Sequence, residues 1–294
     1  MHIAWNLYEV WSSPLHEDRP SKTAYRVALR RAAHQVLDVP QVFTDPLALA
    51  IVGAESEALR SDSKSRSKMS RVLRAFLVVR SRYAEDGLAR TVESGTRQYV
   101  VLGAGLDTFA YRNPYPGLRV FEVDHPATQG WKRRRLEAAG ISIPESMTFA
   151  PIDFESQTLS EGLARAGFQM DQKAFFSWLG VVPYLTRSAV TETFRFVGSL
   201  PTGSEIVFDY ALPPESLNLV QRFAFNALAE RVAAAGEPFQ TFFEPSALMS
   251  ELRRVGFGFF EDLGGEEINA RYFSGRSDGL RVAGGVGRLM KARV

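Results

Sequence analysis

A glycine-containing turn follows a short apolar run at Tyr99–Leu102, in the sequence Leu102-Gly103-Ala104-Gly105-Leu106-Asp107. Glycine lets a ligand approach the backbone closely, and nucleotides commonly bind at such turns after a buried strand. A dinucleotide site would favour a third glycine at position 108, where this sequence has Thr108. The turn therefore favours a nucleoside over a pyrophosphate, although Gly-x-Gly alone also occurs in tight turns that bind nothing.

A carboxylate follows at the spacing expected for a ribose ligand. Asp124 ends the apolar run Val120–Asp124 and lies 21 residues after Gly103. An acid about 20 residues beyond such a turn can accept hydrogen bonds from two adjacent ribose hydroxyls. We therefore predict that Asp124 binds ribose, and Glu122, which alternates to another face, is the lesser candidate.

A third polar feature follows the next predicted strand. Asp153 and Phe154 come directly after residues 147–152. The carboxylate could accept a hydrogen bond from an adenine amino group beside the aromatic ring, or Asp153 could simply cap the next helix. Three such features at successive strand ends suggest an adenosine ligand without a diphosphate.

The elements that position these residues alternate between strands and helices. Apolar runs predict strands at 99–102, 119–123, 147–152, 174–178 and 205–210, and helices are expected at 126–139, 156–166 and 187–199. This order predicts an α/β fold with a mostly parallel sheet and ligands at its carboxyl edge. Two further strands, near 257–263 and 280–292, would bring the sheet to seven.

The flanking regions read as helical. Helices are expected at 23–36, from 46 and at 72–93, with a polar loop or mobile lid at 60–74. We expect a lid or cap region at 1–95 and a nucleoside-binding domain at 96–294. A helical insert at about 213–250 would contain helices at 215–235 and 245–255.

The composition limits the function classes. The 294 residues include 35 Lys and Arg, 33 Asp and Glu, four His and no Cys. Disulfides and thiolate nucleophiles are therefore excluded, and the near-balanced charge gives little reason to expect a nucleic-acid partner. No apolar run is long enough to span a membrane and no signal peptide is recognised, so we expect a cytoplasmic protein with a small-molecule substrate and no membrane partner. The oligomeric state stays open.

Several motifs together carry a family resemblance. They are Thr23-Ala24, residues 43–48, Arg80-Ser81-Arg82-Tyr83, residues 102–108, residues 121–125 and residues 178–185, which span about residues 21–211. In order and spacing the sequence resembles the leucine carboxyl methyltransferase-like family of class I methyltransferases that depend on S-adenosyl-L-methionine (SAM), including its bacterial members of unassigned substrate. The resemblance implies a Rossmann-like fold with helices on both faces of a seven-stranded sheet, and SAM as the cofactor.

The resemblance also assigns roles to residues. Arg80 matches an arginine that holds the SAM carboxylate, and Arg30 or Arg31 lies near another basic contact. The methionine-side turn matches Gly103, Ala104 and Gly105, the ribose acid matches Asp124, and the adenine contacts match Asp153 and Phe154. One departure is Leu179, where many relatives carry a glutamate that contacts the amino group of the cofactor.

The methyl acceptor is less well specified. A carboxylate acceptor needs no general base, whereas a hydroxyl usually needs one, commonly a histidine. Since histidines are few and His125 suits a ribose-side or structural role, we expect an O-methyltransferase that prefers a carboxylate of a small metabolite. Tyr184 and Tyr210, at strand ends, would position the acceptor or simply pack there.

Three alternatives remain open. A protein C-terminal carboxyl methyltransferase is disfavoured by Leu179, and an NAD(P)-dependent oxidoreductase is disfavoured by the missing third glycine. A non-catalytic SAM-binding module is the third. No metal site is expected.

Overall fold

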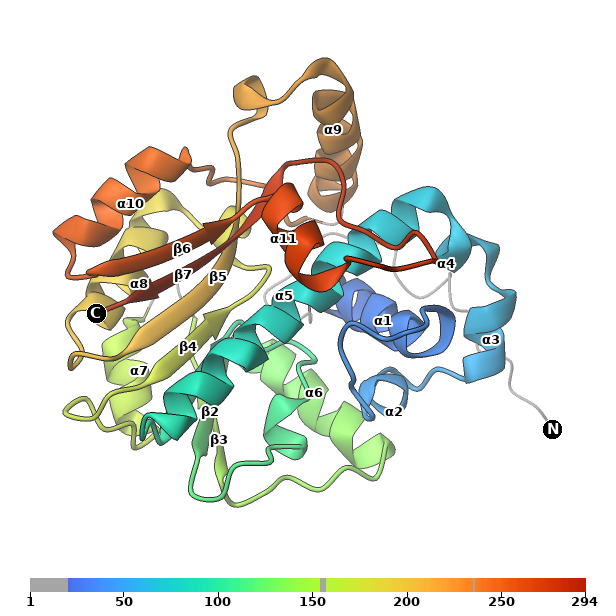
Figure 1. Ribbon diagram of the computed structural model, residues 1–294. Helices are drawn as coiled ribbons and strands as arrows, with labels where there is room; N and C mark the ends of the chain where they lie inside the picture. The colour runs from blue at the N-terminus through green and yellow to red at the C-terminus, as the bar shows by residue number, and fades with distance from the viewer. Residues whose placement is uncertain (1–20, 154–156, 235) are drawn as a thin grey trace.

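The computed structural model describes residues 21–153, 157–234 and 236–294. Within these residues seven strands form one sheet in the order β3-β2-β1-β4-β5-β7-β6 (Figure 1). The strands are β1 (Gln98–Leu102), β2 (Arg119–Asp124), β3 (Met147–Pro151), β4 (Phe175–Trp178), β5 (Glu205–Ala211), β6 (Phe259–Leu263) and β7 (Gly287–Arg293). Neighbours among β1 to β5 pair in parallel, and β7 is antiparallel to both β5 and β6. The predicted α/β fold with a mostly parallel seven-stranded sheet is confirmed.

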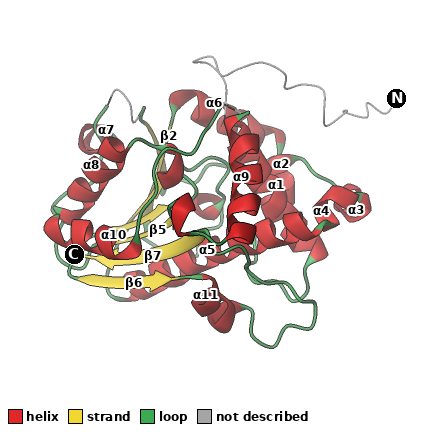
Figure 2. Ribbon diagram, turned by 90° about the horizontal axis from the view of Figure 1, so that it is seen from above, coloured by secondary structure: helices red, strands yellow, loops and turns green. Residues whose placement is uncertain are grey.

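Helices cover both faces of the sheet (Figures 1 and 2). The central strands are apolar along their length because both faces are buried. One face packs against helices α7 (Leu159–Arg165), α8 (Arg187–Gly198) and α10 (Pro245–Arg254), and the other packs against α5 (Lys68–Glu93) and α11 (Gly265–Tyr272). Since Tyr83 and Leu88 of α5 share a core with Tyr99 and Phe175, the expected boundary at residue 95 does not separate two cores.

A smaller core fixes the N-terminal helices onto the glycine turn. It lies between α1 (Lys22–Leu37), α2 (Ala48–Val52) and α6 (Pro126–Ala138) and contains Leu106 of the turn. Alanines supply much of it, including Ala28, Ala32 and Ala48, so the helices approach closely. Ser21 caps α1 by accepting a hydrogen bond from the Ala24 amide at 3.0 Å.

The segment at 60–74 is helical, which corrects the expected loop. Helices α3 (Ser56–Ser61) and α4 (Ser63–Arg66) precede α5, which begins at Lys68. Asp62 accepts hydrogen bonds from the Lys64 and Ser65 amides, and Ser67 accepts one from Ser70. The polar side chains that suggested a solvated loop therefore include helix caps.

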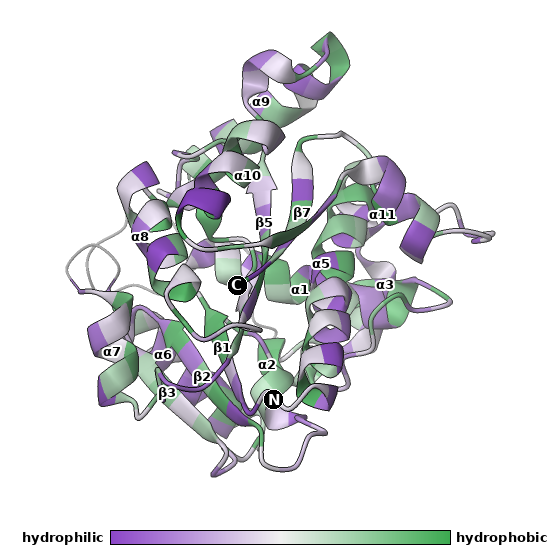
Figure 3. Cartoon of the chain, turned by 60° about the vertical axis from the view of Figure 1, so that its left-hand side comes forward, coloured by the Kyte–Doolittle hydropathy of each residue, from purple (hydrophilic) through white to green (hydrophobic). Residues whose placement is uncertain are grey.

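The C-terminal third contains an insert and a shortened last strand. The insert carries α9 (Leu219–Ala233), which stands out from the body at the top of Figure 3. Strand β7 begins at Gly287 and not near 280, because Gly284 (φ +99°) and Gly285 (φ +65°) form a turn. Helix α11 was not predicted. The described residues also contain the short 3₁₀ helices η1 (Phe109–Tyr111), η2 (Val182–Tyr184) and η3 (Pro214–Ser216).

Candidate cofactor and acceptor site

The glycine turn lies at the carboxyl end of β1 in a conformation that requires glycine. Gly103 has φ +64° and Gly105 has φ +47°. A Cβ atom on Gly103 would lie 2.3 Å from Cγ2 of Val181, and one on Gly105 would lie 3.2 Å from Cβ of Ala24. The turn is therefore enclosed by the segment after β4 on one side and by α1 on the other. The Ala104 amide donates to the Val123 carbonyl at 3.0 Å, which ties the turn to β2.

Asp124 lies directly against this turn. Its Oδ2 accepts a hydrogen bond from the Gly105 amide at 2.6 Å, and its Oδ1 accepts one from the His125 amide at 2.7 Å. Burial raises the pKa of Asp124, and the two amides partly offset this by stabilising the carboxylate. Each oxygen keeps a further lone pair, so the carboxylate can still accept from two adjacent hydroxyls. The geometry fits the predicted ribose contact.

Asp153 lies two residues beyond the end of β3. The Ile152 amide donates to the Asp124 carbonyl at 3.0 Å, which joins the two strand ends. The N-cap of α7 is Thr158, so Asp153 does not cap that helix. The adenine contact stays a prediction for Asp153, and Phe154 lies outside the described residues.

Arg80 reaches the carboxyl ends of β4 and β5 from α5. Its Nη1 lies 3.1 Å from Oδ2 of Asp209, whose Oδ1 accepts a hydrogen bond from the Gly180 amide. Gly180 has φ +73°, and a Cβ atom there would lie 2.6 Å from Nη2 of Arg80. The guanidinium therefore packs flat against the turn after β4. Arg82, from the same motif, is exposed and pairs with Asp86.

The side chain of Leu179 is half-buried against the hydrophobic core. It packs beside the cluster under α5, so this position supplies no polar group to the site. Leu179 therefore differs from the glutamate of many relatives in its chemistry and also in packing against apolar neighbours.

A buried polar network behind the turn was missed by the sequence analysis. Arg31 donates to the Leu106 carbonyl, and its Nε lies 2.7 Å from Oδ2 of Asp45. The Thr108 hydroxyl donates to the same Asp45 oxygen at 2.8 Å. Thr108 thus has its own role, beyond being the missing third glycine. The Asp45-Pro46 pair was the available signal, because it occurs in one of the family motifs.

A buried hydroxyl near the turn fits a polar ligand. The Thr23 hydroxyl oxygen is buried, and no hydrogen-bond partner for it exists among the residues the structure describes. Thr23 precedes Ala24, the residue in closest approach to Gly105. Buried polar atoms are almost always hydrogen-bonded, so such an atom favours a ligand or water nearby. Together with Asp124 and Arg80, it makes the residues present suitable for SAM.

Tyr184 lies on η2 beside the Arg80 side of the site. Its ring centroid is 5.1 Å from that of Phe239, in the segment after α9. Burial raises the pKa of Tyr184 well above its ordinary value; the Arg80 charge opposes this, while Glu237 and Asp209 add to it. With its pKa raised, the phenol keeps its proton at neutral pH and can donate a hydrogen bond.

Tyr210 does not face the site, which corrects the prediction. It is buried in the core, and its hydroxyl donates to Oδ1 of Asp262 at 3.0 Å. Its neighbour Asp209 is the β5 residue that points toward Arg80. Successive strand residues face opposite sides of a sheet, and here the acid is the residue on the Arg80 side.

The two histidines in the described ranges both have structural roles. His34 is buried, with Nδ1 2.8 Å from Asp38 and with Nε2 accepting from the Val42 amide at 3.0 Å. His125 caps α6, its Nδ1 accepting from the Ala127 amide at 3.2 Å. These contacts assign both imidazole rings to the support of the fold and not to proton transfer.

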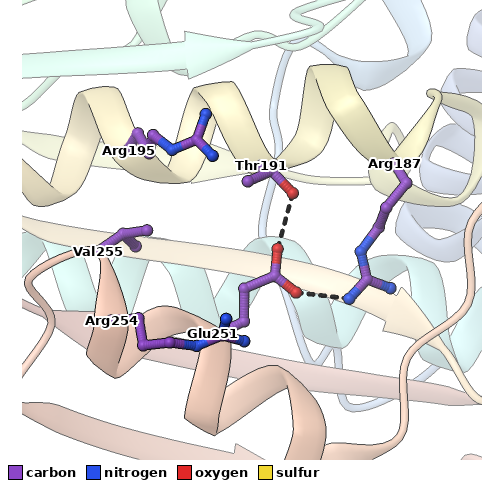
Figure 4. Close-up of a pocket in the computed structure, with 6 residues that line it drawn as sticks. All are labelled: Arg187, Thr191, Arg195, Glu251, Arg254 and Val255. Atoms are coloured by element: carbon purple, nitrogen blue, oxygen red, sulfur yellow. Dashed lines mark hydrogen bonds and ion pairs between the residues drawn. The ribbon is translucent and has the colours of Figure 1, made fainter.

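Two surface grooves lie away from these residues. One, of about 430 Å³, lies between α8 and α10, where Glu251 accepts hydrogen bonds from Thr191 and Arg187 (Figure 4). The other, of about 580 Å³, lies beside α5 and α11. Neither is lined by Arg80, Gly103 or Asp124. Over the described ranges, no three His, Asp or Glu side chains gather as a metal site, and no helix is long and apolar enough to cross a bilayer.

The sequence is also similar to known proteins. The sequence model of the leucine carboxyl methyltransferase family matches residues 24–198. YktD of Bacillus subtilis strain 168, named provisionally as a SAM-dependent methyltransferase, is 33% identical over 296 residues, which cover 90% of this chain and 95% of YktD. A Frankia alni protein with the same provisional description is 32% identical and covers 72% of this chain and 74% of its own.

Solved structures show the same fold. A provisionally named methyltransferase from Thermobifida fusca YX has a TM-score of 0.57 and 19% identity, and covers 97% of this chain and 98% of its own. A DUF574 family protein from Streptomyces avermitilis has a TM-score of 0.54 and 17% identity, and covers 83% and 94%. The chain therefore belongs to the leucine carboxyl methyltransferase family and is a SAM-dependent methyltransferase.

Proposed function

We propose that this enzyme transfers the methyl group to a carboxylate of a small metabolite. The observation that carries the proposal is the place of the Tyr184 phenol on η2, close after the Gly180 turn against which Arg80 packs. Tyr184 can bind an acceptor by donating a hydrogen bond, which suits an anionic oxygen. A carboxylate is already a nucleophile, so it needs no base to remove a proton.

The segment after α9 favours a small acceptor over a protein terminus. Gln240 donates through its amide to the Pro183 carbonyl at 2.7 Å and through Nε2 to the Tyr184 carbonyl at 2.6 Å. Thr241 donates to the Leu185 carbonyl at 2.6 Å. These bonds hold the segment against η2, and the rings of Phe225, Phe239 and Phe242 pack together behind it. Such a cover suits a compact, partly aromatic molecule.

The proposed roles of the chain's own residues follow from their places. Asp124 holds the ribose hydroxyls, and Arg80, oriented by Asp209, holds the amino-acid carboxylate. SAM, when bound, supplies a sulfonium-activated methyl group. Tyr184 donates a hydrogen bond to one acceptor oxygen and so aligns the other for attack. With SAM bound, transfer would join that oxygen to the methyl carbon and leave the electron pair of the broken C–S bond on sulfur.

Matched acceptors test the proposal. The enzyme is incubated with methyl-labelled SAM and either 2-naphthoate or 2-naphthol, and labelled products are treated with alkali. A methyl ester releases labelled methanol, whereas a methyl ether is stable. Alkali-labile product from the carboxylate is expected, and alkali-stable product from the phenol alone would overturn the proposal.

A hydroxyl acceptor is the second candidate, favoured by one observation. Oε2 of Glu237 is buried without a hydrogen-bond partner in the described part of the chain, and its charge acts on Tyr184. A free carboxylate at this place could accept the proton of a hydroxyl acceptor.

A further inference from the structure

A completely buried carboxylate lies behind the glycine turn. Asp45 belongs to the segment between α1 and α2, and its side chain has no exposed surface. Nε of Arg31, from α1, lies 2.7 Å from Oδ2 of Asp45, and the Thr108 hydroxyl donates to the same oxygen at 2.8 Å. The Leu47 amide donates to Oδ1 at 3.1 Å. A buried carboxylate with several donors has one fixed orientation, so it also fixes the groups that donate to it.

Two of these donors connect Asp45 to the glycine turn. Arg31 donates through Nη2 to the Leu106 carbonyl, and its Nη1 lies 3.8 Å from Oδ2 of Asp107. Thr108 is the next residue along the chain and donates to Asp45 directly. Three consecutive residues at the exit of the turn are therefore linked to Asp45, two of them through Arg31.

The exit of the turn is continuous with the amide that contacts Asp124. Gly105 directly precedes Leu106, and its amide donates to Oδ2 of Asp124 at 2.6 Å. Only one peptide group separates this amide from the Leu106 carbonyl that Arg31 holds. A displacement of the Arg31 guanidinium therefore passes to the Gly105 amide through the main chain of two adjacent residues.

A second arginine extends the network to α5. Nε of Arg112 donates to the Thr108 hydroxyl at 3.2 Å and lies 3.6 Å from Oδ1 of Asp45. Its Nη1 donates to Oε2 of Glu85, on α5, at 2.9 Å. Arg112 therefore has a carboxylate of its own, whereas Asp45 is the acid nearest to Arg31. Loss of the Asp45 charge would thus fall mainly on Arg31, because a buried charge without its partner is costly.

Another buried aspartate has comparable partners but no connection to the turn. Asp38 accepts hydrogen bonds from Nε and Nη2 of Arg74 at 2.6 and 2.9 Å, and Nδ1 of His34 lies 2.8 Å from it. In the described ranges, the other side-chain hydrogen bonds of Arg74 and His34 lead to residues 42, 43 and 65 and not to the glycine turn. Asp38 is therefore a matched control for the loss of a buried acid.

We propose that Asp45 is a positioning residue for the nucleoside half of SAM. Its charge holds Arg31 on the Leu106 carbonyl and so keeps the Gly105 amide in place on Asp124. Asp45 is buried behind the turn, so it acts through these residues and not by contact with the cofactor. The proposal rests on the predicted ribose contact of Asp124 and is independent of the methyl acceptor. Preorganisation of this kind raises affinity by lowering the cost of ordering the site.

Asp45→Asn removes the charge and keeps an oxygen for the Thr108 hydroxyl and the Leu47 amide. Calorimetry measures binding of S-adenosylhomocysteine and of adenosine to the wild type, Asp45→Asn and Asp38→Asn, at a temperature where thermal melting shows each protein folded. We expect Asp45→Asn to bind both ligands about tenfold more weakly, with unchanged stoichiometry. Asp38→Asn should bind both as the wild type does. A merely structural role of Asp45 would instead lower the stoichiometry, because it removes folded sites without changing their affinity.

Arg31→Gln tests the route through the guanidinium. It should weaken both ligands by a similar factor, and the double variant with Asp45→Asn should lose little more than either single variant, because both changes break one path. Losses that add in full would overturn the route through Arg31. Arg31→Lys keeps a cation beside Asp45 and so answers the same question should Asp45→Asn fail to fold. Because lysine lacks the guanidinium fork, Arg31→Lys should still show the equal loss for both ligands.

Three other results would overturn the proposal. They are unchanged affinity in Asp45→Asn, an equal loss in Asp38→Asn, and a loss for S-adenosylhomocysteine alone, which would place the effect on the amino-acid side at Arg80. Asp124→Ala judges the ribose contact separately. If Asp124→Ala weakens adenosine and Asp45→Asn does not, the ribose contact stands and the positioning role fails. If neither variant weakens adenosine, the ribose contact itself is wrong.

Discussion

Nη1 of Arg80 lies 3.1 Å from Oδ2 of Asp209, so the arginine predicted to bind the cofactor carboxylate is already oriented by an acid of its own chain. The same acid accepts a hydrogen bond from the Gly180 amide. One side chain at the end of β5 thus fixes both the guanidinium and the turn after β4. Preorganisation of this kind lowers the entropic cost of binding.

Asp209→Ala should therefore weaken the binding of S-adenosylhomocysteine, although we do not expect Asp209 itself to contact that ligand. Without its anchor, Arg80 must be ordered by the ligand itself, and the Gly180 amide loses its acceptor. We expect S-adenosylhomocysteine to bind about tenfold more weakly. Asp209→Asn keeps an acceptor for the Gly180 amide and should lose less affinity for S-adenosylhomocysteine. Calorimetry on both variants checks this order, and equal losses would show that the Gly180 bond does not matter.

Arg80→Ala should discriminate between parts of the cofactor. A guanidinium that holds the amino-acid carboxylate contributes nothing to adenosine. We expect binding of S-adenosylhomocysteine to fall by about tenfold or more and binding of adenosine to change little. Arg82→Ala, on the exposed side of α5, is the control. A similar loss for both ligands would misplace Arg80.

Asp124→Ala should weaken S-adenosylhomocysteine and adenosine alike. The carboxylate accepts from the Gly105 and His125 amides, so its removal takes away the ribose contact and loosens the turn. A loss of about tenfold or more is expected for each ligand. Asp171→Ala, in an exposed loop, serves for comparison in the same titration. Unchanged affinity would refute the ribose role.

Glu237→Gln should separate the two acceptor classes. With a carboxylate acceptor, the negative charge of Glu237 is unhelpful, so its removal should leave turnover within about twofold or raise it. With a hydroxyl acceptor, loss of the base should lower turnover by about a hundredfold. The measurement is the initial rate of label transfer to 2-naphthoate and to 2-naphthol. A hundredfold loss on the carboxylate would contradict the proposed chemistry.

The loss of folding stability at acid pH should depend on Asp38. Burial would raise its pKa, but hydrogen bonds from Arg74 and His34 lower it from 3.8 to about 2. Because the folded-state pKa lies below the unfolded one, this stabilisation is present above pH 3.8 and is lost as the pH falls towards 2. It amounts to about 2 kcal/mol at neutral pH.

Urea unfolding of the wild type and Asp38→Asn at pH 7, 4 and 3 measures this contribution. The variant should be less stable at pH 7, and the difference should narrow between pH 4 and 3. A constant difference across that range would exclude titration of Asp38 as the cause.

Much of the fold was predictable because continuous apolar runs mark the parallel strands, and the strand ends then place Asp124 and Asp153. The partners of the individual side chains were harder to predict from the sequence. Asp209 and Tyr210 both stand at the end of β5, and only the pleat of the folded strand decides that the acid faces Arg80 while the phenol turns to Asp262. Periodicity marks the strand end but not the face of each residue there.

The same limit applies to helices and to charge runs. Arg30 and Arg31 are consecutive, and no local signal tells which of them meets Asp45. The run Lys132–Arg135 reads as a solvated face, yet Lys132 is buried with its Nζ 2.7 Å from Glu122. Such pairs depend on how α6 packs on β2, which is a property of the assembled structure.

The close approach of Val181 to Gly103 joins the two halves of the site. The glycine turn is bonded through the Gly105 amide to Asp124, the predicted ribose ligand, and Val181 follows the Gly180 turn that supports Arg80. Any larger residue at position 103 would displace the glycine turn and the Val181 segment at once. Affinity for the nucleoside and affinity for the amino-acid portion are therefore not independent traits, and selection on one of them constrains the other.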